Sequence, residues 1–133
     1  MPLPGEAGVV MRGGTRRDAS ALLTYLRSEQ DRGRPMRLSV FAADPVPNHG
    51  EQEDLIGLCR SAQAPWTKVQ VTTVQTLADA GYVLVDERDE SEADCHFHVY
   101  FPRNVSESDA QRFIDCFSQP IANPVPKLER STW

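Results

Sequence analysis

The fold is decided by the stretch Cys95-His-Phe-His-Val-Tyr-Phe101 and by the stretch after it, Ser106-Glu-Ser-Asp-Ala-Gln-Arg-Phe-Ile-Asp-Cys-Phe117. The first alternates polar and apolar side chains, which predicts a β-strand with one buried face. The second begins with Ser106 and Asp109 at the spacing of a capping box, which predicts the start of a helix. Its apolar residues recur at helical spacing: Ala110, Phe113, Ile114 and Phe117.

Weaker patterns outside this region predict the remaining elements. Further strands are predicted over residues 8–12, 37–43, 68–72 and 82–85. Further helices are predicted from Thr15 to Gly33, over 51–62, and after a cap at Thr73. We expect residues 82–85 and 95–101 to form an antiparallel hairpin, whereas the early strand–helix–strand units favour some parallel pairing.

This order of elements predicts an α+β fold in a single domain. We expect a mixed, mostly antiparallel sheet of about five strands, with three to four helices packed mainly on one face. Residues 1–133 fit one domain, with a flexible N-terminus at residues 1–7. We expect the proline-rich tail, residues 118–133, to run extended over the surface or to be disordered, because Pro120, Pro124 and Pro126 exclude further helix.

Composition indicates a cytoplasmic location. No apolar run approaches the length of a membrane span, and the N-terminus lacks the pattern of a secretory signal. The three cysteines form no C-x-x-C pair, so reduced thiols are expected, and neither a metal nor a cofactor is favoured.

Charge is unevenly distributed along the chain, whose formal net charge is −5. Residues 1–40 hold seven Lys and Arg against four Asp and Glu, whereas residues 41–133 hold seven against fifteen. This acidic balance disfavours nucleic acid as a partner, because nucleic-acid binding relies on basic side chains. It favours a basic protein partner.

The densest acidic stretch, residues 86–94, is the main candidate partner-binding site. It lacks the residue order of a calcium-binding loop. Its alternative role is that of a solubilising loop. Trp66 is a second candidate contact because tryptophan is enriched in interface hot spots, although it could also cover the core. The acidic candidates are Asp86, Glu87, Asp89, Glu90, Glu92 and Asp94.

A histidine pair on the strand 95–101 is a candidate catalytic or metal site. His96, His98 and Tyr100 leave the same face of that strand, opposite its apolar residues. The pair could act as general base and acid, or supply two metal ligands, but no spacing indicates a third ligand. The alternative is an ordinary polar strand face.

The stretch Arg12-Gly13-Gly14-Thr15-Arg16 is a candidate anion-binding site. It places a glycine turn between a predicted strand and a predicted helix start, where backbone N–H groups attract anions. It matches neither a P-loop nor a dinucleotide fingerprint. The alternative is a tight turn whose arginines point into water.

Two functions remain open from these observations. The favoured one is a small, acidic, non-enzymatic protein-binding module, such as an antitoxin, an immunity protein or another accessory inhibitor, that docks on a basic partner. The alternative is a small enzyme or toxin acting on a phosphate-bearing substrate, RNA or a nucleotide, through His96, His98 and Arg12. That alternative requires the two strands to be neighbours in the sheet. The sequence leaves self-association open.

Overall fold

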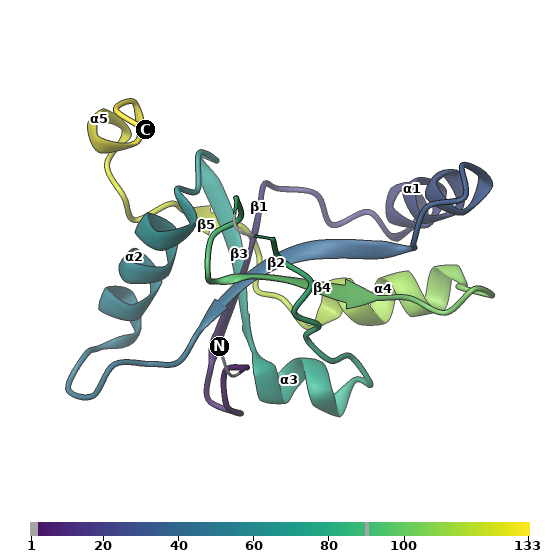
Figure 1. The fold of residues 1–133 in the computed structure, drawn as a ribbon, viewed down its shortest axis with the longest axis horizontal. Helices are drawn as coiled ribbons and strands as arrows, with labels where there is room; N and C mark the ends of the chain where they lie inside the picture. Colours follow the sequence, from purple (N-terminus) through teal and green to yellow (C-terminus); the bar gives the residue numbers. More distant parts are fainter. Residues whose placement is uncertain (1–2, 90) are drawn as a thin grey trace.

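The computed structural model describes residues 3–89 and 91–133 and contains a five-stranded sheet with five helices (Figure 1). The strand order is β4-β2-β1-β3-β5. The strands are β1 (Val9–Gly13), β2 (Arg37–Ala43), β3 (Lys68–Thr73), β4 (His96–Tyr100) and β5 (Ile121–Ala122). The helices are α1 (Ala19–Asp31), α2 (Glu51–Ala62), α3 (Val74–Asp79), α4 (Glu107–Asp115) and α5 (Lys127–Arg130). This architecture confirms the α+β class and the sheet of about five strands.

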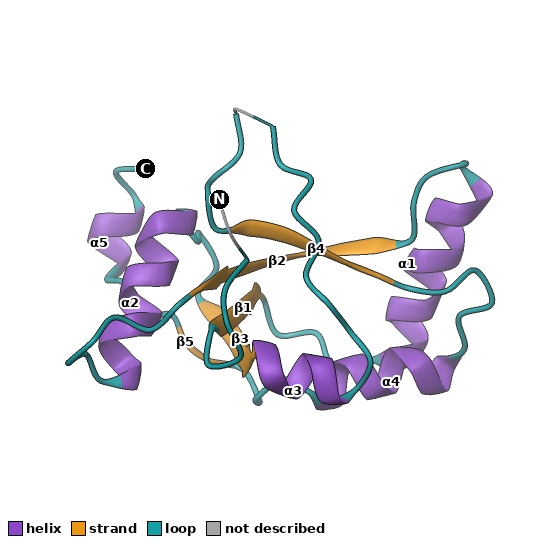
Figure 2. Ribbon diagram, turned by 60° about the horizontal axis from the view of Figure 1, so that its bottom comes forward, coloured by secondary structure: helices purple, strands orange, loops and turns teal. Residues whose placement is uncertain are grey.

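The expectation of some parallel pairing is wrong for the described strands, because all four strand pairings are antiparallel. The reason lies in the position of α1. This helix packs against α4 near one end of the sheet, on the face that α4 also covers, and the chain then returns as β2 beside β1 in the opposite direction (Figure 2).

The two faces of the sheet have separate cores. One face, which carries Val10, Val40 and Phe97, packs against α1, α3 and α4. The other face, which carries Met11 and Val69, packs against α2. Three helices therefore share one face, and α2 covers part of the other.

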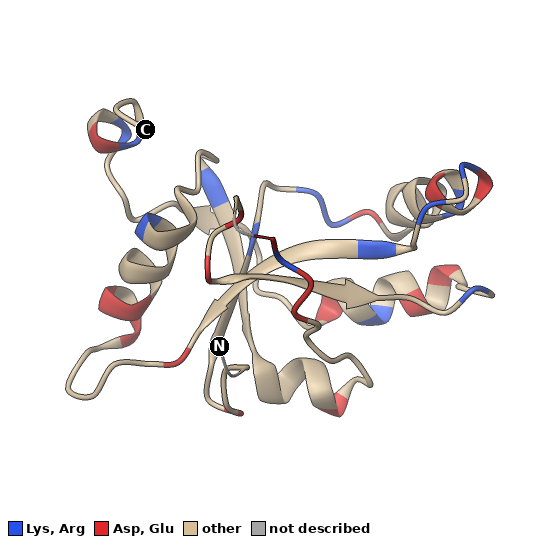
Figure 3. Cartoon of the chain, viewed as in Figure 1, with Lys and Arg blue, Asp and Glu red and all other residues tan. Residues whose placement is uncertain are grey.

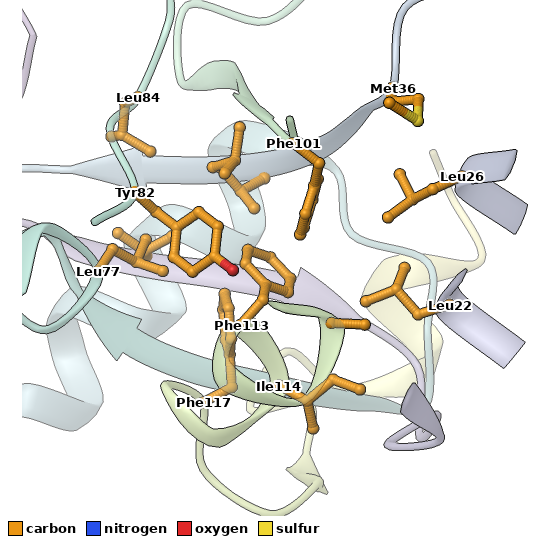
Figure 4. Close-up of a cluster of buried hydrophobic side chains, with 14 of the residues drawn as sticks. Leu22, Leu26, Met36, Leu77, Tyr82, Leu84, Phe101, Phe113, Ile114 and Phe117 are labelled. Carbon is orange, nitrogen blue, oxygen red and sulfur yellow. The ribbon is translucent and has the colours of Figure 1, made fainter. Parts of the chain in front are cut away.

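Phe113 of α4 lies at the centre of the larger core (Figure 4). Its ring centroid is 5.1–5.4 Å from those of three aromatic neighbours, Tyr82, Phe101 and Phe117. The predicted capping box is confirmed, since the Ser106 side chain accepts from the Asp109 backbone N–H and the Asp109 side chain accepts from the Ser106 backbone N–H. Local periodicity therefore predicted this helix correctly.

One predicted strand and one predicted helix boundary are wrong. Residues 82–85 form no strand beyond one antiparallel bridge between Val85 and His98. The side chain of Tyr82 is instead held by the core, where its hydroxyl donates to the Asp109 carbonyl at 2.7 Å. Helix α1 begins at Ala19, not at Thr15, because the carboxylate of Asp18 caps it by accepting from two backbone N–H groups.

The C-terminal tail contains a short strand and a short helix, so the expectation that its prolines exclude further helix is wrong. Strand β5 pairs with β3, and the buried Asn123 amide donates to two backbone carbonyls near the start of β3. Helix α5 follows Pro126 directly, since a helix start tolerates a residue that lacks an N–H. An ion pair between Arg60 and Glu129, with N–O distances of 2.8 and 2.9 Å, fastens α5 to α2.

The N-terminal segment is only partly described. Residues 1 and 2 lie outside the described residues, so the flexibility expected for residues 1–7 is untested there. Within the remainder, Gly5 donates its backbone N–H to Asp44 at 2.8 Å. No helix in residues 3–89 or 91–133 combines the length and the apolar character needed to cross a membrane.

Candidate functional site

The pairing of β2 with β4 places the histidines beside three residues of β2 on one face of the sheet. Arg37 lies opposite Tyr100, Ser39 opposite His98 and Phe41 opposite His96. These pairs are neighbours across an antiparallel ladder, so their side chains emerge on the same side. The register therefore assembles a polar and aromatic surface from two strands that are more than fifty residues apart in sequence.

Aromatic rings form a continuous row on this face. The ring centroids of Trp66 and Phe41 are 6.1 Å apart, those of Phe41 and His96 are 5.2 Å apart, and those of His96 and His98 are 4.8 Å apart. Trp66 is 36% exposed at one end of the row, and Tyr100, the next residue of β4 on this face, is 39% exposed. We call these five side chains the aromatic face.

Glu87 binds the acidic segment (residues 86–94) to the aromatic face. Its carboxylate accepts from the Tyr100 hydroxyl at 2.5 Å and from Arg37 at 3.1 Å. The hydrogen bond from Tyr100, followed by the charge of Arg37, lowers the pKa of Glu87 below its ordinary value. Glu87 is therefore held as a carboxylate at neutral pH.

Glu92 makes the second attachment, through His96. Its carboxylate contacts Nδ1 of His96, while Nε2 of the same ring lies 2.9 Å from Oγ of Ser39. A hydroxyl, an imidazole and a carboxylate in this order are the groups that activate a serine as a nucleophile. Ser39 is exposed, so its hydroxyl is accessible from solution.

His98 is buried beneath the acidic segment. Its Nδ1 lies 3.4 Å from a Glu87 oxygen but finds no hydrogen-bond partner in the part of the chain that the structure describes. Burial lowers the pKa of His98, with further lowering from the charges of Arg37 and His96, while Glu87 and Glu92 oppose the shift. The neutral imidazole is therefore favoured.

The remaining described carboxylates of the acidic segment face solvent. Asp86, Asp89 and Asp94 are exposed, and Figure 3 shows acidic residues along this segment, which runs over β2 and β4. Arg88 holds the segment in shape by donating to the Asp94 carbonyl at 2.7 Å, with its guanidinium 5.6 Å from the Phe97 ring centroid. Glu90, also predicted to bind a partner, lies outside the described residues.

The Arg12 region lies on the other side of the molecule. The guanidinium of Arg12 is 5.6 Å from the ring centroids of Phe113 and Phe117, on the sheet face covered by α4. Strand β2 separates β1 from β4, so Arg12 and the histidines share no cleft. The alternative function thus lacks the neighbouring strands that it required.

The glycine turn is not a helix start. Gly14 adopts a positive φ of 91°, and its carbonyl accepts from the Gln70 amide at 3.1 Å, while five residues separate Gly13 from the start of α1. Of the five predicted anion-binding residues, only Arg12 and Arg16 line one cavity, and Gly13, Gly14 and Thr15 do not.

The expectation that the arginines of this segment point into water is wrong for Arg12 and Arg17. Arg17 donates to the carbonyls of Phe117 and Ser118, at 2.9 Å each, and to Gln70 at 3.3 Å. These carbonyls lie just beyond the end of α4, outside its hydrogen-bond ladder, and Arg17 supplies donors to both.

Sequence reasoning missed the contribution of β2 to the site. Arg37, Ser39 and Phe41 alternate along that strand, which is the only local signal that they share a face. Nothing in the sequence pairs β2 with β4, and that register alone brings the three residues to the histidines.

Neither metal ligands nor known proteins provide further evidence about the chemistry of this surface. Among residues 3–89 and 91–133, no group of three His, Cys, Asp or Glu side chains is placed to hold a metal ion. Comparison of the chain with protein-family profiles, with curated proteins and with solved structures finds no match.

Proposed function

We propose that the chain is a small protein-binding module, of the kind that antitoxins, immunity proteins and accessory inhibitors represent, and that it docks on a basic partner. The observation that carries this proposal is the position of the acidic segment beside the aromatic face. The segment carries exposed carboxylates at Asp86, Asp89 and Asp94, and it contacts the aromatic face through Glu87 and Glu92. Trp66 and Tyr100 of that face are partly exposed. Aromatic anchors with surrounding charge are typical of protein interfaces.

The attachments of the acidic segment support the same proposal. Glu87, Arg88 and Glu92 fix it to the sheet, so its shape is set before a partner arrives. A surface that is ordered in advance loses less conformational entropy on binding. The exposed charges would steer a basic partner to this surface and fix its orientation. Free thiols at Cys59, Cys95 and Cys116 fit docking in the cytoplasm.

We call the acidic segment and the aromatic face together the docking surface. Two charge-matched variants test whether its acidic segment binds the partner. The first removes exposed carboxylates of the acidic segment: Asp86→Asn, Asp89→Asn and Asp94→Asn. The second removes as many carboxylates elsewhere: Asp31→Asn, Glu51→Gln and Glu107→Gln. Each variant loses three of the negative charges of a chain with net charge −5, so only their positions differ. Asparagine keeps an oxygen that can accept from Ser91 as Asp89 does.

Capture from host lysate, with mass spectrometry of the retained proteins, gives the readout. We expect the wild-type chain and the second variant to retain one basic protein in about equimolar amount, and the first variant to lose it. Retention should fall as ionic strength rises above about 0.15 M, where charges are screened beyond roughly 8 Å. Equal retention by both variants would remove the acidic segment from the interface.

A second candidate function is an enzyme or toxin acting on RNA or a nucleotide, and one cavity favours it. This cavity, of about 530 Å³, is lined in part by Arg34, Arg37, Ser39 and His98. Guanidinium groups suit a phosphate. In this cavity Arg37 would have the phosphate-binding role that the sequence suggested for Arg12. His96 and His98 are the acid–base candidates, with Tyr100 as an orienting donor.

Replacing both histidines tests this candidate. If they act as acid and base, the variant His96→Ala with His98→Ala should cleave an RNA oligonucleotide at least about a hundredfold more slowly than the wild type. Thermal unfolding of the same sample checks that the fold persists without the buried His98. Cleavage at the wild-type rate would exclude a chemical role for the pair.

A further inference from the structure

Arg12 is a partly buried cation that has no ion-pair partner among residues 3–89 and 91–133. Its Nη1 is buried and finds no hydrogen-bond acceptor among the described residues. None of the ion pairs found in those residues involves it. Two aromatic rings, Phe113 and Phe117, lie against the guanidinium, but they supply no lone pair to its N–H groups. Such a group is costly to fold unless something else satisfies it.

The groups around Arg12 increase the electrostatic cost of its unpaired charge. Burial, followed by repulsion from Arg17, lowers the pKa of Arg12. Arg17 itself is taken up by the carbonyls of Phe117 and Ser118. Asp18, the one acid that lines a cavity together with Arg12, caps α1 through Oδ1 of its carboxylate. The lining of this cavity therefore carries two cations, Arg12 and Arg16, against the one carboxylate of Asp18.

A cavity of about 230 Å³ opens at Arg12, between α1, α4 and the sheet. Leu22 and Ile114, two of its apolar lining residues, lie at the edge of the core cluster in Figure 4. Arg12, Arg16 and Tyr25 supply the hydrogen-bond donors of its side-chain lining, and Asp18 supplies a carboxylate. A cavity of roughly 150 Å³ suffices for benzene, so this one has room for a small ring with one charged substituent.

We propose that this cavity is a binding site for a small organic carboxylate, whose apolar body lies between Leu22 and Ile114 and whose carboxylate pairs with Arg12. The planar guanidinium matches a carboxylate with two parallel hydrogen bonds. A phosphate dianion fits less well, because the Asp18 carboxylate on the same lining repels two charges more strongly than one, and because Leu22 and Ile114 offer its oxygens no hydrogen bond. The site is on the opposite sheet face from the docking surface and does not depend on the proposed function.

Thermal unfolding with three probes tests the ligand class. Benzoate should raise the melting temperature of the wild-type chain in a concentration-dependent manner, because a ligand that binds only the folded state stabilises it. Benzamide, which has the same ring without the charge, and inorganic phosphate should leave the melting temperature unchanged. A shift with phosphate alone, or no shift with benzoate, would overturn the proposal.

Two matched variants assign the effect to Arg12. The variant Arg12→Met should bind benzoate at least about tenfold more weakly, and it should melt higher than the wild type without ligand, because the unpaired charge is gone. The variant Arg27→Met, at an exposed arginine of α1, should behave as the wild type.

A purely structural role for Arg12 gives the opposite pattern. In that case Arg12→Met melts lower than the wild type, and benzoate binds both proteins equally or neither. If Arg12→Met does not fold, amide chemical shifts of the wild type during a benzoate titration decide the question. Changes centred on Leu22 and Ile114 support the proposal, and changes elsewhere contradict it.

Discussion

Replacing Phe113 with alanine is expected to lower the free energy of unfolding by about 3–5 kcal/mol, the range for a large-to-small change in a close-packed core. Phe113 is 0% exposed, and three aromatic rings pack around it. The variant loses these contacts and leaves a cavity that the helix and the sheet cannot close. Urea unfolding followed by circular dichroism measures the change.

The matched control is Leu128→Ala in α5, because Leu128 is 84% exposed. A surface truncation of this kind should change the free energy of unfolding by less than about 0.5 kcal/mol. If Phe113→Ala is as mild as Leu128→Ala, then α4 does not pack on the sheet as described.

The variant Gly13→Ala is expected to destabilise the fold by about 1–3 kcal/mol or more, through overpacking. A Cβ atom at Gly13 would lie 2.0 Å from a ring carbon of Trp66, so the ring must leave its position against β1. Because Trp66 also contacts Phe41, its displacement should disturb the aromatic face as well. Urea unfolding gives the stability, and a red shift of tryptophan emission reports the exposed ring.

Gly57→Ala provides the matched control for the glycine substitution. Gly57 is exposed in the middle of α2, and a Cβ atom there meets nothing within 4 Å. Alanine should therefore stabilise the helix by about 0.5–1 kcal/mol. If the two variants shift stability in the same direction, the close approach of Trp66 to β1 is contradicted.

Gly13 and Gly14 illustrate what local sequence can show. The sequence predicted a turn at Gly13 and Gly14, and the positive φ of Gly14 explains the second glycine. The need for the first glycine comes from Trp66, which lies fifty-three positions away in the chain. Nothing in the spacing of the sequence indicates that contact.

The candidate site also has a part that local sequence predicted and a part that it did not. Alternation along β4 placed the two histidines and Tyr100 opposite the buried Phe97 and Val99, as the structure shows. It did not show that His98 is itself buried, because the cover is the acidic segment, attached through Glu87 and Glu92. Two candidates that the sequence treated separately are therefore one surface.

Local signals in the sequence predicted three features correctly: the capped helix α4 with its apolar stripe, the helix over residues 51–62, and the two-sided pattern of β4. Those features depend on side-chain period and on caps a few residues apart. The strand order, the placement of Arg12 away from the histidines, and the attachment of the tail became visible only in the folded chain. Each of these depends on pairing between distant segments, and the free energy of that pairing belongs to the assembled core and not to any local stretch.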